Sequence, residues 1–183
     1  MKVEDIYGDF PILETERLLL RKVTMDDAED MFEYGSNDEV TKYVTWDTHK
    51  TIEDARGFID FILNKYAQQA VAPWGIEEKA TGKFIGTIDF FAWNVAFKTA
   101  EIGYVIAPDY WGKGITAEAA AAITDFGFEK MELVRIQARC FVANIGSERV
   151  MEKIGMQFEG IHRKAMFIKG VHEDLKMYAI VKE

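Results

Sequence analysis

The sequence has little of the features that mark secreted and membrane proteins. It contains one cysteine, Cys140, so no disulfide can form within the chain, and a single thiol fits a reducing compartment. No stretch approaches the roughly 18 consecutive apolar residues of a membrane-spanning helix. The opening residues, MKVEDIYGDFP, have no apolar segment of the kind found in secretion signals. We therefore expect a cytoplasmic protein without a membrane partner.

An excess of positive charge is also missing. The chain has 22 Lys and Arg residues against 31 Asp and Glu residues, a net charge of −9. This balance argues against a nucleic-acid partner. The acidic excess lies in residues 1–110, whereas residues 111–183 are close to neutral. An anionic cofactor would meet the neutral part and a cationic acceptor could meet the acidic part, but solvation of exposed helices explains many of these acids equally well.

The composition predicts one folded domain over residues 1–183, because 49% of the residues are hydrophobic and no repeat or linker divides the chain. Alternation and helical spacing predict the elements in order. Strands are expected at 17–23, 71–78, 84–93, 99–106, 134–142, 156–167 and 171–181, and helices at 24–35, 51–66, 116–128 and 144–154. This order predicts a mixed α/β domain in which about four helices flank a central mixed sheet of six or seven strands. Residues 1–16 and 36–50 are expected to be irregular.

The stretch from Ile102 to Phe128, IGYVIAPDYWGKGITAEAAAAITDFGF, is the centre of the functional prediction. It reads as a strand, a turn with Gly112 and Gly114, and a helix with Thr116 at its N-cap or in its first turn. Unpaired amides at such a helix start can bind an anion. On these residues alone a plain connector is an equally good interpretation. The dinucleotide fingerprint G-x-G-x-x-G is not met, because Ala117 occupies the place of its third glycine.

A family resemblance rests on four segments taken together: ETERLLLRKVTMDDAEDMF, AEIGYVIAPDYWGKGITAEAA, NIGSERVMEKIGMQFEG and KGVHEDLKMYAI. With these segments the chain resembles the GNAT superfamily of N-acetyltransferases, in its RimJ/RimL-like branch, over about residues 13–181. The resemblance implies a single acetyltransferase domain with its cofactor-binding core at about 84–160. It also implies acetyl-CoA as the donor substrate and no metal.

The resemblance further implies a site for the CoA pyrophosphate, made of the amides of one turn: Trp111, Gly112, Lys113, Gly114, Ile115 and Thr116. Trp111 and Thr116 depart from the superfamily pattern Gln/Arg-x-x-Gly-x-Gly/Ala, so the expectation concerns backbone contacts. The strand residues Tyr104, Val105 and Ile106 are expected beside the pantetheine arm. A splay between this strand and the one at 134–142 is expected to open the slot, and Asn144 resembles the residue that hydrogen-bonds the arm.

Acetyl transfer to an amine requires a base for the ammonium proton and a proton for the departing thiolate. Glu101 lies between Ala100 and Ile102, and such apolar neighbours would raise its pKa. A solvated strand carboxylate is the better interpretation of the residues alone, whereas the resemblance implies that Glu101 is the base, acting directly or through water. Ser147 resembles the group near the CoA sulfur that assists thiolate departure. Helix capping by Asn144 and a surface position for Ser147 are the structural alternatives.

The remaining candidate residues give weaker indications of function. Cys140 is expected to be a buried small apolar group, and the three histidines have no metal-ligand spacing. The resemblance implies a primary amine as acceptor, either a protein N-terminus or a small-molecule amine, and a homodimer is compatible with the sequence. The alternative function is a non-catalytic module that binds or senses acyl-CoA. The joint presence of Glu101, Asn144 and Ser147 speaks against that alternative.

Overall fold

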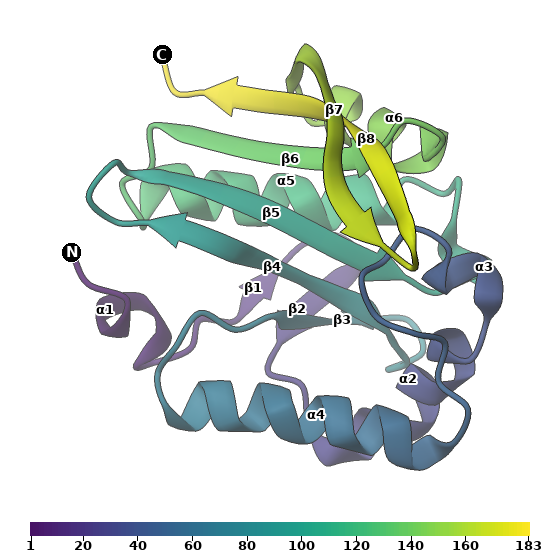
Figure 1. The fold of residues 1–183 in the computed structure, drawn as a ribbon. Helices are drawn as coiled ribbons and strands as arrows, with labels where there is room; N and C mark the ends of the chain where they lie inside the picture. Colours follow the sequence, from purple (N-terminus) through teal and green to yellow (C-terminus); the bar gives the residue numbers. More distant parts are fainter.

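The computed structural model describes all 183 residues, which form one eight-stranded sheet with helices on both faces (Figure 1). The sheet order is β1-β2-β3-β4-β5-β6-β8-β7. Its strands are β1 (Leu13–Glu14), β2 (Leu18–Arg21), β3 (Trp74–Glu78), β4 (Phe84–Asn94), β5 (Thr99–Ile106), β6 (Arg135–Phe141), β7 (Gln157–Ile168) and β8 (Val171–Val181). The helices are α1 (Glu4–Tyr7), α2 (Ala28–Gly35), α3 (Asp38–Thr41), α4 (Ile52–Ala67), α5 (Ile115–Glu129) and α6 (Ile145–Lys153), with 3₁₀ turns at Met25–Asp27 and Pro108–Tyr110. None of the helices combines the length and apolar content needed to cross a bilayer.

The predicted fold class is confirmed, but the counts were too low: the sheet has eight strands rather than six or seven, and there are six helices rather than four. The additional elements lie in the two segments expected to be irregular. Strand β1 has two residues and forms only because Leu13 pairs with Leu20 of β2. Helix α3 is a single turn, capped where the Asn37 side chain accepts a hydrogen bond from the Glu39 amide at 2.9 Å. Elements this short carry no periodic signal.

Two predicted helix starts rest on local hydrogen bonds. The Asp54 carboxylate accepts from the Thr51 amide at 3.0 Å, and the Asp27 carboxylate accepts from the Thr24 amide at 2.8 Å. Each acid also lies in the first turn, where the helix dipole favours negative charge. Thr51 begins α4 as predicted, whereas Thr24 leads through a 3₁₀ turn into α2.

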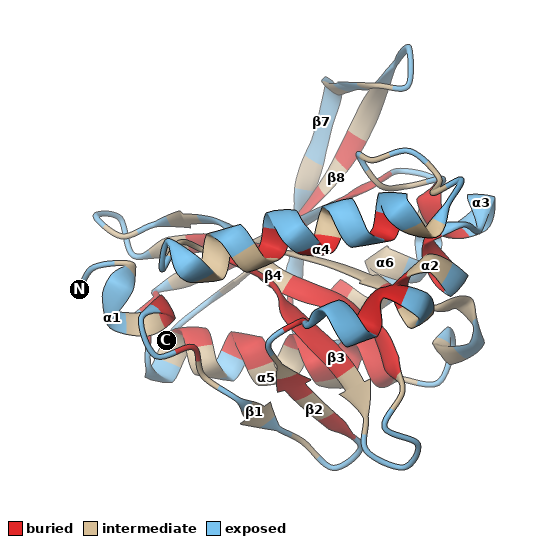
Figure 2. Cartoon of the chain, turned by 90° about the horizontal axis from the view of Figure 1, so that it is seen from below, coloured by how far each residue is buried: buried red, intermediate tan, exposed pale blue.

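The hydrophobic core has two main parts, one on each face of the sheet. The larger part packs α5 against strand residues such as Ile102 and Ile136, and the smaller packs α2 and α4 against Phe84. Figure 2 shows the buried stripes of α4 and α5 turned toward the strands between them. Since neighbouring residues of a strand point to opposite faces, β5 directs Ile106 toward α5 and Val105 toward α4. The two faces of this one strand therefore line two different spaces.

The β7–β8 hairpin projects from the body of the protein (Figure 2). In the view of Figure 1 it extends across the front of the sheet toward α3. At its tip, Lys169 Nζ donates to the Thr41 carbonyl oxygen at 2.6 Å. A small apolar cluster around Phe141 also includes Met166 of the hairpin and Tyr43 of the α3–α4 loop. The hairpin is thus fastened to a segment more than a hundred residues earlier in the chain.

Candidate active site

The only parallel strand pair of the sheet comes apart halfway along its length. Strands β5 and β6 are paired at Thr99–Arg135, Ala100–Ile136 and Glu101–Gln137, and the ladder stops there although both strands continue. Residues 103–106 of β5 keep their antiparallel partners on β4, so their β6-facing edge has unpaired backbone groups. This confirms the splay expected between the two strands. Such an edge can hydrogen-bond an extended ligand in the manner of an added strand.

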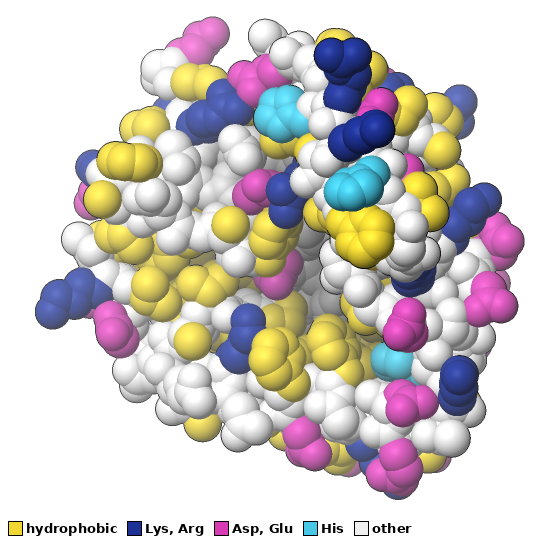
Figure 3. Space-filling view, in the orientation of Figure 1, with side chains coloured by type: hydrophobic (Ala, Val, Ile, Leu, Met, Phe, Trp, Pro, Cys, Tyr) yellow, Lys and Arg dark blue, Asp and Glu magenta, His cyan; other side chains and the backbone are white.

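A cleft of about 770 Å³ occupies the gap. Residues 102–106 of β5 run along the cleft, and on the α5 side it is lined by the turn residues Trp111, Gly112 and Thr116 and by residues 143–147 at the start of α6. On the other side it is lined by residues of α4, β4, the α3–α4 loop and the hairpin. Figure 3 shows the hollow beside the hairpin, with hydrophobic side chains on its walls and both acidic and basic ones inside. A single cleft therefore reaches from one helical layer toward the other.

The turn before α5 has a backbone arranged for an anion. Gly112 has φ +71° and Gly114 has φ +76°, a left-handed conformation that side chains oppose. Gly114 is the N-cap of α5, so Thr116 lies in the first turn rather than at the cap. The amides of residues 112–117 donate to no backbone carbonyl, and the helix ladder begins with Glu118 N to Gly114 O. Trp111 is exposed, but its indole Nε1 donates to the Ile106 carbonyl at 3.0 Å and ties the turn to β5.

Two cations from distant parts of the chain lie at this turn, and neither was predicted. Arg17 Nη1 donates to the Lys113 carbonyl at 3.0 Å, while its Nε pairs with Glu118 at 2.7 Å. Lys153, at the end of α6, places its Nζ 3.0 Å from the position that a Cβ on Gly114 would occupy. Arg17 already has an anion in Glu118, whereas Lys153 has no ion pair within the chain and lies beside the positive end of the helix, where an anion is favoured. Both residues are brought here by tertiary packing, so nothing in their local sequence marks them.

At the start of α6, Asn144 and Ser147 are both structural and accessible to the cleft. Asn144 is the N-cap, where its Oδ1 accepts from the Ser147 amide at 3.2 Å, and its amide nitrogen stays free for a ligand. The Ser147 hydroxyl is not free, because it lies 2.9 Å from the hydroxyl of Tyr104. Burial raises the pKa of Tyr104 well above its ordinary value. Tyr104 was expected only as a neighbour of the cofactor, but the structure joins it to Ser147 in one hydroxyl pair.

Glu101 is buried, but its surroundings differ from the apolar ones expected. Gln137 Nε2 donates to its Oε2 at 3.0 Å, and Arg139 Nε lies 2.8 Å from its Oε1 in an ion pair that is not aligned as a hydrogen bond. Glu101 is also absent from the residues that line the cleft, whereas Arg139 is among them. The carboxylate therefore has polar partners in addition to the apolar neighbours Ala100 and Ile102. Its partners come from β6, which adjoins β5 only in the folded sheet.

A second carboxylate, Asp89 of β4, lies in the cleft. It pairs with Gly103 across the sheet, and a Cβ on Gly103 would come within 3.5 Å of its Oδ1. The Asp89 side chain has no hydrogen bond or ion pair within the chain. Burial raises its pKa from 3.8 to about 7, against a smaller opposing effect of Lys65. In the sequence Asp89 is only a lone acid inside an apolar strand, and that pattern alone does not distinguish a buried carboxylate from a solvated one.

No group of three His, Cys, Asp or Glu side chains is placed to hold a metal ion. Cys140 lies on β6 facing the α5 core, and it is buried as expected. Burial raises the pKa of its thiol to about 11, so the thiol stays protonated near neutral pH.

Comparison with known proteins now identifies the family. Residues 17–157 match the model of the acetyltransferase (GNAT) domain. The chain belongs to the GNAT acetyltransferase family. The uncharacterized N-acetyltransferase YoaA of Bacillus subtilis is 41% identical over 173 residues, which cover 94% of this chain and 98% of that protein. The predicted family is confirmed, and the wider domain bounds of 1–183 stay a prediction.

Solved structures of GNAT proteins have the same fold as this chain. A GNAT-family acetyltransferase from Bacillus anthracis superposes with a TM-score of 0.83 at 35% identity, covering 93% of this chain and 98% of that one. The microcin C7 self-immunity acetyltransferase MccE, determined in complex with acetyl-CoA and AMP, has a TM-score of 0.81 at 25% identity, covering 92% and 94%. The RimJ/RimL-like resemblance is supported by the ribosomal-protein-serine acetyltransferase of Escherichia coli, which is 33% identical over 97 residues, or 53% of this chain and 54% of that protein.

Proposed function

We propose that this GNAT protein transfers the acetyl group of acetyl-CoA directly to a primary amine while both substrates are bound. The observation that carries this proposal is the strand separation beyond Glu101 and Gln137, which lets one cleft connect an anion-binding turn with the carboxylate of Asp89. A thioester held in the gap would meet the amine without leaving the protein. Holding two reactants in line in this way supplies a large part of the rate of a bimolecular reaction.

The donor side of the cleft would hold CoA mainly by its backbone. The amides of Gly112, Lys113, Gly114, Ile115 and Thr116 would bind the diphosphate, with Lys153 adding positive charge. The Trp111 amide, expected in this set, instead donates to the Pro108 carbonyl at 3.0 Å, so it is not available to a ligand. The β5 edge at Tyr104, Val105 and Ile106 would run beside the pantetheine arm, and the free amide nitrogen of Asn144 would donate to it. MccE, which has the same fold, was determined in complex with acetyl-CoA and AMP, and this supports acetyl-CoA as the donor.

The reaction forms a bond from the amine nitrogen to the acetyl carbon and breaks the bond from that carbon to the CoA sulfur. A backbone amide of β5 at the gap would stabilise the oxygen of the reacting carbonyl. The thiolate that departs needs a proton, and the paired hydroxyls of Ser147 and Tyr104 would supply it. Since the two hydroxyl oxygens lie 2.9 Å apart, a proton lost from one group can be replaced by the proton of the other.

We assign proton removal from the amine to Asp89 in preference to Glu101. Asp89 lines the cleft and has a pKa of about 7, which suits a base near neutral pH. Glu101 lies behind Arg139 and is held in an ion pair with it. In this assignment Glu101 is a positioning residue that fixes the Arg139 guanidinium. The sequence-based assignment of Glu101 as base is the competing hypothesis, and the two variants Asp89→Asn and Glu101→Gln distinguish them.

The acceptor is a primary amine of a small molecule or of a protein N-terminus. The test is to incubate the purified protein with acetyl-CoA and a panel of amines, and to follow the appearance of free thiol and of the N-acetyl product. We expect thiol release that depends on an amine. CoA binding without thiol release for any amine would contradict the proposal and favour the alternative, a module that binds or senses acyl-CoA.

A further inference from the structure

The acceptor side of the cleft has aromatic walls. Phe61 and Phe91 are 55% and 45% exposed, although both line the cleft, and exposed apolar groups gathered in a hollow mark a binding surface. The complete aromatic set on this side comes from the α3–α4 loop, α4, β4 and β6: Tyr43, Trp46, Phe58, Phe61, Phe91 and Phe141. These walls fit an acceptor with an apolar body, and they offer little to an acceptor that is polar along its whole length.

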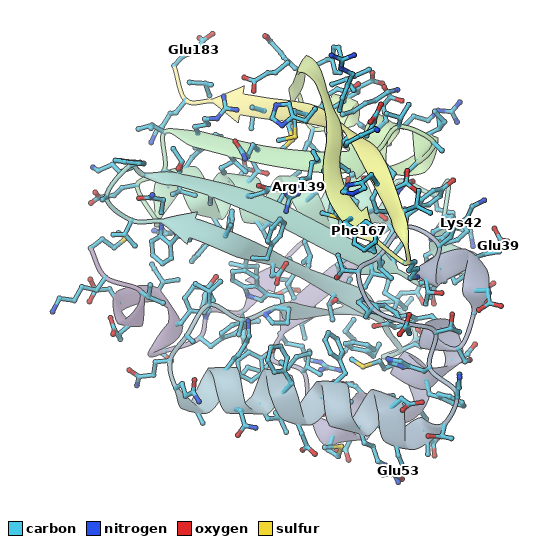
Figure 4. The ribbon with its side chains drawn as sticks, in the orientation of Figure 1. Glu39, Lys42, Glu53, Arg139, Phe167 and Glu183 are labelled. Carbon is cyan, nitrogen blue, oxygen red and sulfur yellow. The ribbon has the colours of Figure 1, made fainter.

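Only two cations line the cleft, Lys65 and Arg139, and their situations differ. The Arg139 guanidinium is already neutralised by Glu101 at 2.8 Å. In Figure 4 Arg139 lies in front of the sheet, beside the hairpin that carries Phe167. Lys65 has no ion pair and no hydrogen bond within the chain, and its Nζ lies 4.9 Å from the centre of the Phe61 ring. One half-buried positive charge on the acceptor side thus has no carboxylate in direct contact, and only a through-space interaction with Asp89.

This charge bears directly on the choice of acceptor. Lys65 is close enough to Asp89 to oppose the rise in the pKa of that carboxyl, so its field reaches the place where the amine must react. A cation in an amine-binding site repels any second ammonium of the acceptor. It attracts a single negative group, and because only one cation of the cleft is free of a direct ion pair, a carboxylate matches it better than a doubly charged phosphate.

We infer that the preferred acceptor is a monoamine whose apolar body carries one carboxylate, as in a free aromatic or large aliphatic amino acid, with Lys65 as the counter-ion of that carboxylate. This inference rests on the proposed acetyl transfer and narrows its acceptor. It sets a small amino acid apart from a polyamine and from a protein N-terminus, which has a peptide bond in place of the carboxylate.

The experiment compares kcat/KM for four amines: phenylalanine, phenethylamine, spermidine and a short peptide that begins with phenylalanine. Phenethylamine has the same aromatic body without the carboxylate. We expect phenylalanine to be preferred over phenethylamine by about ten- to a hundredfold, the range of a hydrogen bond to a charged group. In Lys65→Gln this ratio should fall to near one, mainly through a higher KM for phenylalanine, and Lys65→Arg should retain most of it.

The ratio is the informative quantity, because any effect of Lys65 on Asp89 acts on both acceptors and cancels. Lys42→Gln is the matched control: Lys42 also lies over a ring, 5.4 Å from that of Tyr43, but it does not line the cleft. Its ratio should equal that of the wild type. Acetylation of phenethylamine, spermidine or the peptide with no preference for phenylalanine would overturn this inference and leave the proposed function intact. CoA binding without acetylation of any amine would overturn both.

Discussion

The two ends of the cleft are built in different ways. The donor end is made of backbone: glycines with positive φ, unpaired amides at the start of α5 and the free edge of β5. Most of it lies in the single stretch from β5 to the start of α6. The acceptor end is made of side chains that come from α4, β4, β6 and the β7–β8 hairpin.

This difference explains what each end can do. Backbone amides bind a phosphate whatever the side chains are, so the donor end can stay the same while the sequence changes. An end made of side chains can be rebuilt by single substitutions, and we therefore expect it to decide which amine reacts. Substitutions at the donor end should weaken CoA binding, and substitutions at the acceptor end should change the chemistry or the acceptor while leaving CoA affinity unchanged.

The largest effect is expected from Asp89→Asn. Removing a general base costs about 10²–10⁴ in rate, so kcat should fall by that factor while the Kd for CoA, measured by calorimetry, stays the same. In Glu101→Gln, kcat should fall by less than about tenfold, because this change releases Arg139 without removing the base. The opposite order of the two variants would return the role of base to Glu101.

At the donor end, Gly114→Ala should weaken CoA binding by about tenfold, since one misplaced amide donor to an anion costs about 1.5 kcal/mol or more. The added Cβ would lie 3.0 Å from Lys153 Nζ at a residue with φ +76°. Gly82→Ala is the control, because Gly82 has φ +71° in a turn with open space around it. Both variants should lose similar stability, about 1–2 kcal/mol from the strained backbone. Equal CoA affinities in the two variants would show that the turn does not bind the nucleotide.

The raised pKa of Asp89 should also appear in the stability of the protein. Its pKa is about 7 in the folded chain and near 3.8 when unfolded, so between these values the folded state binds more protons. The contribution of Asp89 to stability is therefore greatest below about pH 4 and is lost as the pH rises toward 7. The Tm of Asp89→Asn minus that of the wild type should increase over this range, at about 2–4 °C per kcal/mol for a chain of this size. A difference that does not change with pH would contradict the raised pKa of Asp89.

The smallest effects are expected from the hydroxyl pair. Tyr104→Phe and Ser147→Ala each leave one polar partner, which should cost about 1 kcal/mol in stability. We expect a loss of kcat of less than about tenfold, since water or the remaining hydroxyl can still protonate the thiolate. Tyr178→Phe, which removes a hydroxyl bound to Glu148 at 2.7 Å, is the control for a lost buried hydroxyl and should keep full activity. A kcat as low in Tyr178→Phe as in Tyr104→Phe would argue against a catalytic role for the pair.

The sequence predicted the donor end better than the acceptor end, and the reason is physical. The glycine turn, the cap at Asn144 and the strands on either side of the gap are local features with local signals. The ion pair of Glu101 with Arg139 and the approach of Lys153 to Gly114 arise only when distant strands and helices pack together. Asp89 was missed for the same reason, because its raised pKa depends on burial that no neighbouring residue reveals.

The most direct test of the account is the position of CoA in a complex with this protein. We expect the diphosphate against the amides of residues 112–116 and the sulfur in the gap where β5 and β6 separate, between the hydroxyl of Ser147 and the carboxylate of Asp89. A bound CoA whose sulfur lies outside this gap, or whose diphosphate lies away from the Gly114 turn, would contradict it.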